Sequence, residues 1–381
     1  YNGQYYTCPY WFVKHDGNID DVGRLLMSIY AHFNHQRITE DTDSCLPVAY
    51  HPGFACNLSC EYCYQYVQSE STGQWIKPTS KGSHSVPKND LSQFIVDRMH
   101  QLRKTSVALS FLGGEPLLYL QDIKDTVAAI RNVTSISETH FITNGVLIDN
   151  RVIDVLHTME NPSVQITLDG GRNSHDHYRH LANGLGTYDR LLTTIGVLID
   201  SGVSLHVRIN ATSKSIGEIP GALRDLASYA IAPNMSIDIA LIDDTDKFHD
   251  SNMNHEIIDE YEHLYFISGY LGFKISPPWM RDGCATCQRQ INGLPHGIVL
   301  TSSGDLYSCW DSAGQSNMSM GNIHTGYHKG CFERTWVQCG YMSSIPRSQF
   351  KQLRIHCLCA AADGRVMAEQ RSSRAEQLMN N

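Results

Sequence analysis

The sequence predicts an α/β fold built on a parallel sheet of six strands, followed by a cysteine-rich C-terminal region. Between residues 47 and 242, short apolar or alternating runs take turns with segments of helical periodicity. Strands that alternate with helices form βαβ units, whose strands lie parallel. Beyond residue 243 lie seven of the twelve cysteines, most of them in close groups.

Six runs have the composition of strands. The last three alternate strictly between apolar and polar residues, which is typical of half-buried strands. The runs are Val48–Phe54, Val107–Leu112, His140–Thr143, Val164–Leu168, Leu205–Ile209 and Ile237–Leu241.

Helical faces, with apolar residues three and four positions apart, lie between these runs. A six-stranded sheet with functional loops at its strand ends suits a partial (β/α)6 barrel, by analogy with the eightfold barrel, and a doubly wound sheet is the alternative. The faces are Leu91/Phe94/Ile95/Met99/Leu102, Val152/Val155/Leu156/Met159 and Leu191/Ile195/Leu198/Ile199.

The chain divides into three predicted regions: an N-terminal extension (1–46), the barrel (47–242) and the C-terminal region (243–381). The extension has one plausible helix, around residues 22–29. Residues 69–90 are rich in Ser, Gly, Pro and Lys, which predicts a long mobile loop.

Composition excludes several classes of protein. The net charge is −9 and there is no long basic run, so we expect no nucleic-acid partner. No stretch approaches eighteen apolar residues, so we expect no membrane span, and no secretory signal pattern precedes the first strand. Grouped cysteines in such a chain indicate metal ligation in a reducing cytoplasm rather than disulfides.

The segment CNLSCEYC places Cys56, Cys60 and Cys63 on one tight loop after the first predicted strand. A [4Fe–4S] cluster normally takes four thiolates, so three leave one iron open to a chelating ligand. Zinc is the alternative metal, but zinc sites usually take four ligands in two pairs.

This motif, with Tyr62 before its third cysteine, resembles the signature of the radical SAM superfamily. The resemblance implies that three thiolates hold a [4Fe–4S] cluster and that the methionine end of S-adenosylmethionine (SAM) chelates the fourth iron. Other segments match the family in order, at predicted strand ends from about residue 50 to 215. They are SFLGGEPLL (Ser110–Leu118), TNG (Thr143–Gly145), ITLDGGRNSHDHYR (Ile166–Arg179) and VRIN (Val207–Asn210).

The resemblance also implies a set of SAM-binding residues. Gly113 and Gly114 would let the backbone approach the ligand, and Glu115 would pair with its ammonium group. A simple turn is the alternative for the glycines, and surface ion pairs are the alternative for Arg179 and Arg208. The expected cofactor-binding residues are Tyr62, Gly113, Gly114, Glu115, Pro116, Asn144, Thr167, Asp169, Arg179 and Arg208.

CATC, which contains Cys284 and Cys287, and GDLYSC, which ends at Cys309, resemble the start of the SPASM extension. That resemblance implies one or two auxiliary [4Fe–4S] clusters; two would need an open iron or a ligand other than cysteine. Packing of reduced cysteines is the alternative. The expected C-terminal metal ligands are Cys284, Cys287, Cys309, Cys331, Cys339, Cys357 and Cys359.

The family resemblance implies an enzyme that cleaves SAM reductively to a 5′-deoxyadenosyl radical, which abstracts hydrogen from a peptide. We expect no catalytic side chain beyond the cluster and SAM, because hydrogen abstraction needs no acid or base. The leading interpretation is a maturase of ribosomally synthesised peptides that performs crosslinking, epimerisation or excision. Its expected partners are a precursor peptide or protein and an electron donor of the flavodoxin or ferredoxin type.

Three alternatives remain open at this point. The first is a sulfatase maturase. Sulfatase maturases of this branch carry an aspartate directly after the G-x4-C cysteine, whereas Trp310 follows Cys309 here and Asp311 comes one position later. A radical SAM enzyme acting on a small molecule is the second. The third is a non-catalytic iron–sulfur electron carrier, although a carrier has no use for an open iron beside a GGEP loop.

Overall fold

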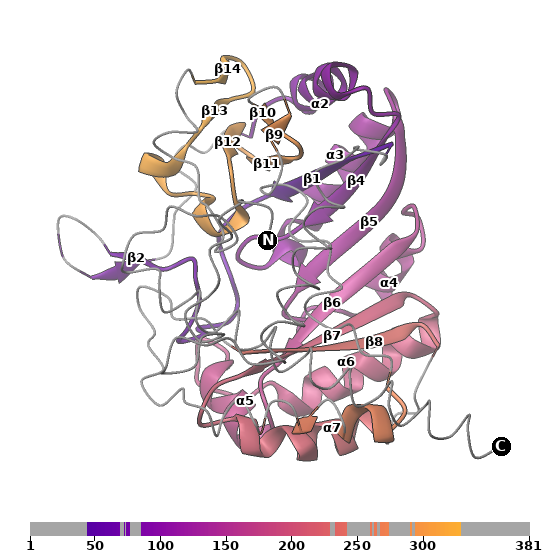
Figure 1. Ribbon diagram of the computed structural model, residues 1–381, viewed down its shortest axis with the longest axis vertical. Coiled ribbons are helices and arrows are strands. Elements are labelled where there is room, and N and C mark those ends of the chain that lie inside the picture. Colours follow the sequence, from indigo (N-terminus) through magenta and orange to yellow (C-terminus); the bar gives the residue numbers. More distant parts are fainter. Residues whose placement is uncertain are drawn as a thin grey trace, which may run out of the picture.

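The computed structural model describes residues 44–68, 72, 74–76, 85–228, 233–241, 260, 263–264, 267–273, 290–291 and 294–328. The predicted N-terminal helix at 22–29 lies outside the described residues. The largest sheet in the described part has ten strands, in the order β14-β13-β12-β11-β1-β4-β5-β6-β7-β8, and it curves through the molecule (Figure 1).

Six strands of this sheet, from β1 to β8, run parallel to one another. Each of them overlaps one of the predicted runs, so the predicted α/β fold is confirmed. The second run, Val107–Leu112, ends one residue beyond β4. The first predicted run extends too far, because the strand ends three residues before Phe54. The strands are β1 (Cys45–His51), β4 (Ser106–Phe111), β5 (Ser135–Thr143), β6 (Pro162–Leu168), β7 (Ser204–Ala211) and β8 (Met235–Leu241).

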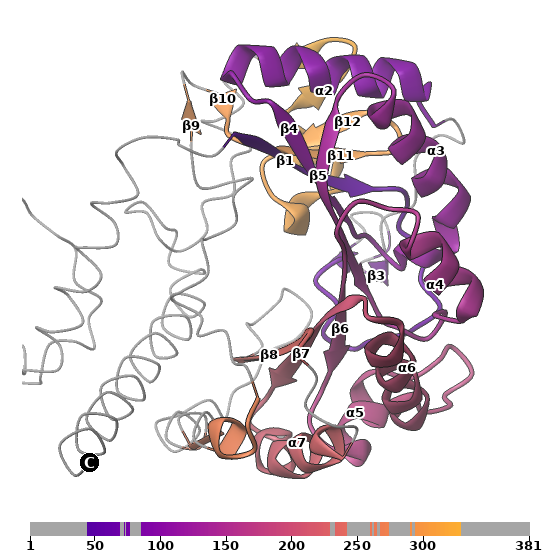
Figure 2. The ribbon, with the colours of Figure 1, turned by 90° about the vertical axis from the view of Figure 1, so that its right-hand side faces the viewer.

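The described helices that connect these strands lie along the outer, convex side of the sheet (Figure 2). A doubly wound sheet would carry helices on both faces, so the arrangement favours the partial barrel. Met159, which we expected on a helical face, is buried just beyond the end of α4. The helices are α2 (Lys88–Leu102), α3 (Leu120–Arg131), α4 (Asn150–Leu156), α5 (Arg172–Tyr178), α6 (Tyr188–Ser201) and α7 (Ile219–Ala227).

The two faces of the parallel sheet differ in polarity. On β6, Val164, Ile166 and Leu168 are buried in the main hydrophobic core. The alternate residues Gln165 and Thr167 point to the opposite, inner face. Parallel sheets are usually apolar on both faces, so a polar inner face indicates that this side serves a site rather than a second core.

Strands from the C-terminal region extend the sheet. β11 (Ile298–Thr301) pairs in parallel with β1, and an antiparallel series follows it. The predicted boundary near residue 243 stays a prediction, but this region and the barrel share one sheet. The later strands are β12 (Asp305–Tyr307), β13 (Gly321–Asn322) and β14 (Gly326–Tyr327), and a separate hairpin is formed by β9 (Gln290–Ile291) and β10 (Leu294–Pro295).

The predicted loop at 69–90 is wrong at its end, because residues 88–90 form the first turn of α2. Pro87 occupies the N-cap position, where no intrahelical N–H bond is lost, and Asp90 in the first turn favours the positive end of the helix dipole. Within the loop, β3 (Trp75–Ile76) pairs with β2 (Val67–Gln68). None of the described helices has both the length and the apolar character that crossing a membrane requires.

Candidate functional site

The motifs found in the sequence meet at one edge of the sheet. The cysteine loop follows β1, the Gly113–Glu115 segment follows β4, Asn144 follows β5 and Asp169 follows β6. These are the carboxyl ends of parallel strands, where loops from neighbouring strands come together. The fold therefore gathers residues that are more than 100 positions apart.

In the described part of the chain, Cys56, Cys60 and Cys63 form no disulfide. Burial of the Cys60 thiol raises its pKa to about 11. The positive charge of Arg179 opposes this rise, whereas the nearby thiols of Cys56 and Cys63 add to it. The sulfur of Cys56 accepts from the Leu58 backbone N–H at 3.4 Å. The three cysteines are thus neighbours on one loop. Among the described residues, however, no group of three or more His, Cys, Asp or Glu side chains is already arranged to hold a metal ion.

Asn144 connects the end of β5 to this loop. Its side-chain amide donates to Oδ1 of Asn57 at 2.7 Å and lies 3.8 Å from the sulfur of Cys56. Hydrogen bonds to cysteine sulfurs are one means by which a protein tunes an iron–sulfur cluster. Asn144 was predicted as a cofactor residue, and here it contacts the first cysteine.

Gly113 and Gly114 pack against the chain that leads into the cysteine loop. Gly113 has a φ of +141°, and a Cβ on Gly114 would lie 2.2 Å from the carbonyl oxygen of Ala55. The Glu115 N–H donates to that same carbonyl at 2.9 Å. We expected the missing side chains of these glycines to make room for a ligand. In the structure, the space is taken by the backbone of residues 53–55.

Glu115 is completely buried and already has protein donors. Its carboxylate accepts from the Thr143 hydroxyl at 2.6 Å, the Asn144 N–H at 2.8 Å and the Leu117 N–H at 3.0 Å. Burial raises the pKa of Glu115, and the bonds from Thr143 and the two N–H groups oppose that rise. The carboxylate therefore holds the ends of β4 and β5 together, whatever else it binds.

Tyr62 is the centre of a buried polar group. Its hydroxyl donates to the carboxylate of Asp169 and accepts from the Arg179 guanidinium at 3.0 Å. Burial raises the pKa of Asp169 and the positive charge of Arg179 opposes that rise. Three of the predicted cofactor residues are thereby joined in one cluster beside Cys60.

The same cluster continues along β7 and β8. The amide of Asn210 donates to the Tyr62 oxygen at 3.4 Å, and its Oδ1 accepts from Arg208 Nε at 2.9 Å. The Arg208 guanidinium also lies 3.3 Å from the buried carboxylate of Asp238. Arg208 is therefore an inner-face residue in an ion pair and is about one-third exposed.

His175, in the predicted His–Asp segment, positions Asp169 rather than facing a ligand. Its Nδ1 accepts from the Asp169 N–H at 3.2 Å, and its Nε2 lies 3.0 Å from the Thr187 hydroxyl. The neighbouring carboxylate of Asp176 accepts from the N–H groups of Thr187 and Tyr188 at the start of α6. Both side chains have structural roles.

Buried polar atoms without partners gather around the cysteine loop. In the described residues they include both ring nitrogens of His51, Nδ2 of Asn57, Nε2 of Gln65, Oδ1 of Asp169 and Nε of Arg179. Leaving such atoms unpaired costs about 1–3 kcal/mol each. Asp169 Oδ1 is an acceptor and Arg179 Nε carries a donor N–H, and both lie beside the three cysteines without a partner in the described residues. The pair suits a ligand that carries charges of both signs.

Several residues of this site were not predicted: His51, Asn57, Gln65 and Asp238. Asn210 was covered by the VRIN segment but was not named as a site residue. The alternation within β7 and β8 was a usable signal, because Asn210 and Asp238 occupy polar positions between buried apolar ones. His51 and Gln65 carry no such signal, because their burial depends on segments distant in the sequence.

The remaining predicted residues have mixed outcomes. Thr167 is buried beside Arg208 in the β6–β7 register, and Pro116 begins the 3-10 helix at Pro116–Tyr119. Cys309 is buried where β12 leads into a short 3-10 helix. The other predicted C-terminal ligands lie outside the described residues: Cys284, Cys287, Cys331, Cys339, Cys357 and Cys359.

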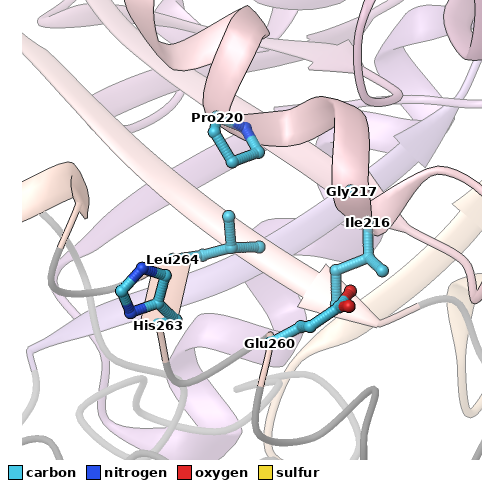
Figure 3. Close-up of a pocket in the computed structure, with 6 residues that line it drawn as sticks. All are labelled: Ile216, Gly217, Pro220, Glu260, His263 and Leu264. Atoms are coloured by element: carbon cyan, nitrogen blue, oxygen red, sulfur yellow. The ribbon is translucent and has the colours of Figure 1, made fainter.

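A cavity of about 370 Å³ lies elsewhere, beside the start of α7 (Figure 3). None of the predicted site residues lines it, so it is separate from the cysteine site. Its lining residues are Ile216, Gly217, Pro220, Glu260, His263 and Leu264.

Comparisons with known proteins agree with this geometry. Residues 50–214 match the sequence family described as the radical SAM superfamily. The chain is 31% identical over 147 residues to the cysteine-type anaerobic sulfatase-maturating enzyme of Clostridium novyi, which covers 38% of this chain and 37% of that protein. It is 24% identical over 180 residues to the sporulation killing factor maturation protein SkfB of Bacillus subtilis, covering 46% of this chain and 38% of SkfB.

Among solved structures, anSMEcpe with bound AdoMet superposes with a TM-score of 0.58 at 17% identity, covering 76% of this chain and 81% of that one. This likeness concerns the fold. The chain spans less than two-fifths of the length of the two curated relatives. By sequence, residues 50–214 form a domain that matches the radical SAM superfamily.

Proposed function

We propose that this chain is a radical SAM enzyme that modifies a peptide. Within that class, we propose that it is a maturase of a ribosomally synthesised precursor peptide. The observation that carries the proposal is the grouping of Cys56, Cys60 and Cys63 beside unpaired buried atoms of Asp169 and Arg179. The radical SAM match over these residues and the names of the two maturing relatives support it.

The residues of the cysteine site suit the two groups that the family implies, a [4Fe–4S] cluster and SAM. Three cysteines would hold a [4Fe–4S] cluster and leave one iron for SAM. Asp169 Oδ1 offers an acceptor for the ammonium group of SAM, and Arg179 Nε offers a donor for its carboxylate. When bound, the cluster and SAM supply a reductive cleavage that yields a 5′-deoxyadenosyl radical able to abstract hydrogen.

The protein's own contribution is to position these groups. Tyr62 fixes Asp169 and Arg179 relative to the cysteine loop, and Glu115 fixes Asn144 against Cys56. We propose that Cys309 and the other C-terminal cysteines hold one or two auxiliary clusters, and that a flavodoxin- or ferredoxin-type protein supplies electrons. The three regions 1–46, 47–242 and 243–381 remain our proposed division of the chain.

A test replaces Cys56, Cys60 and Cys63 by Ala after anaerobic reconstitution with iron and sulfide. Formation of 5′-deoxyadenosine from SAM should be abolished, while any auxiliary iron should remain. The matched control is Cys45→Ala, because this partly exposed cysteine lies on β1 beside Ser137 and outside the site. Continued 5′-deoxyadenosine formation by the triple variant would disprove the proposal.

Sulfatase maturation is the second candidate, favoured by the 31% identity to the Clostridium novyi enzyme. Against it, Trp310 rather than an aspartate follows Cys309. Incubation with a cysteine-containing sulfatase peptide, followed by mass spectrometry, separates the two. A modified sulfatase peptide would favour this second candidate over a peptide maturase.

A further inference from the structure

Three polar side chains form a floor on the inner face of the sheet: His140 on β5, Gln165 on β6 and His206 on β7, which we call the inner floor. These strands are neighbours (Figure 1). Gln165 lies opposite His206 in the strand register, and His140 lies opposite Ser163, two positions before Gln165. Gln165 and His206 each lie two residues before Thr167 and Arg208 on their strands, and His140 lies at the level of Ser163, four residues before Thr167.

Two members of the inner floor have hydrogen-bonding atoms that the described protein leaves unused. Nδ1 of His140 lies 2.8 Å from the Ser163 hydroxyl, but its Nε2 has no partner within the described residues. The side-chain amide of Gln165 likewise makes no hydrogen bond to a described residue. Both side chains are half-buried. Such groups are able to bind a ligand that enters the barrel.

The inner floor carries no uncompensated charge. Burial and the nearby His206 lower the pKa of His140 to about 4, so this imidazole is neutral near pH 7. The carboxylate of Asp238 lies 3.3 Å from Arg208 and 3.9 Å from Nε2 of His206. A charged ligand group would lose hydration here without meeting a free opposite charge, which is unfavourable.

An uncharged group with both a donor and an acceptor suits this surface best. The amide of Gln165 offers one donor pair and one acceptor, and a neutral imidazole offers one of either kind. A primary amide is complementary to both. We propose that the inner floor binds the side-chain amide of a Gln or Asn residue of the substrate, and so selects which peptide segment enters the barrel.

This inference rests on the proposed function only in taking a peptide as the substrate. Its test uses the full chain, reconstituted anaerobically, and four probe peptides of the form N-acetyl-Gly-X-Gly N-methylamide, with X as Gln, Glu, Lys or norleucine, so that only the Gln peptide carries a primary amide. Saturation-transfer NMR reports binding of each peptide and needs no catalytic turnover. In the wild type, the Gln peptide should bind most tightly of the four.

Gln165→Leu keeps the size of the side chain and removes its amide. The affinity for the Gln peptide should fall roughly three- to tenfold, the value of one or two net hydrogen bonds, with the norleucine peptide unaffected. Gln165→Glu should reverse the preference, with the Lys peptide binding more tightly than the Gln peptide. His140→Leu should weaken the Gln peptide to a similar degree.

The matched control is His100→Leu, because His100 lies on the exposed surface of α2. It should leave the binding of all four peptides unchanged. Because Gln165 makes no described protein hydrogen bond, Gln165→Leu decides the matter even where His140→Leu fails to fold. Equal binding of the four peptides by the wild type, or an unchanged Gln preference in Gln165→Leu, would overturn the inference.

The radical reaction is measured separately, as 5′-deoxyadenosine released from SAM in the absence of peptide. Absence of a Gln preference in the wild type, with normal 5′-deoxyadenosine formation, overturns the inner floor alone. No 5′-deoxyadenosine formation by the wild type overturns the proposed function and leaves the peptide-binding result readable.

Discussion

The hydroxyl group of Tyr62 donates a hydrogen bond to the carboxylate of Asp169, 107 positions later in the chain. The same oxygen accepts from Arg179. One phenol therefore fixes the cysteine loop to the end of β6 and separates a buried anion from a buried cation. The pair is a structural link as much as a ligand surface.

Tyr62→Phe should weaken SAM binding and lower the free energy of unfolding by about 1–3 kcal/mol, because Asp169 and Arg179 both lose a partner in a buried place. Calorimetry with SAM and urea denaturation measure the two effects. Tyr270→Phe is the control, since Tyr270 is 92% exposed. If Tyr62→Phe matched the wild type in both measurements, the link would have no energetic role.

Glu115→Ala should destabilise the fold, in addition to any effect on SAM. The substitution leaves the Thr143 hydroxyl and the N–H groups of Asn144 and Leu117 without their acceptor, which should cost roughly 2–4 kcal/mol. Urea denaturation measures the loss. The control is Glu138→Ala, which makes the same substitution at an exposed position of β5. Equal stability of Glu115→Ala and the control would make Glu115 a ligand residue only.

Gly114→Ala should reduce the iron content of the reconstituted protein. Its Cβ would lie 2.2 Å from the Ala55 carbonyl, which belongs to the backbone leading directly to Cys56, so the cysteine loop must shift. Gly221→Ala on α7 is the control: nothing lies within 4 Å of its added Cβ, and the helix should gain about 0.5–1 kcal/mol. Full iron content in Gly114→Ala would show that the loop adapts.

Stability should fall as the pH decreases from about 6.5, partly because of His51. Burial lowers the pKa of His51 to about 3, so in this acid range the unfolded chain binds a proton that the folded chain does not. Between these two pKa values, each unit of decrease in pH lowers the free energy of unfolding by about 1.4 kcal/mol for one such imidazole. His51→Leu removes this cost, so the variant should gain on the wild type between pH 7 and pH 5 in urea denaturation. A constant difference across that range would contradict the assignment.

The sequence predicted the six parallel strands because periodicity and burial coincide there, as at Val164, Ile166 and Leu168. It also located the cysteine loop and Asp169, since short motifs at strand ends carry their own signal. It assigned Gly114 and Glu115 to a ligand, whereas their described contacts are Ala55, Thr143 and Asn144. Those contacts join different strands, and no local pattern records them.

The pairing of β1 with β11 joins Val48 to Ile298, residues 250 positions apart. A ribosome completes β1 long before it reaches β11, so the outer edge of β1 stays unpaired while β4 to β8 assemble on its other side. Unpaired strand edges promote aggregation, and such distant contacts form slowly. Among the six parallel strands, the outer edge of β1, directly before the cysteine loop, is thus the last edge to be paired.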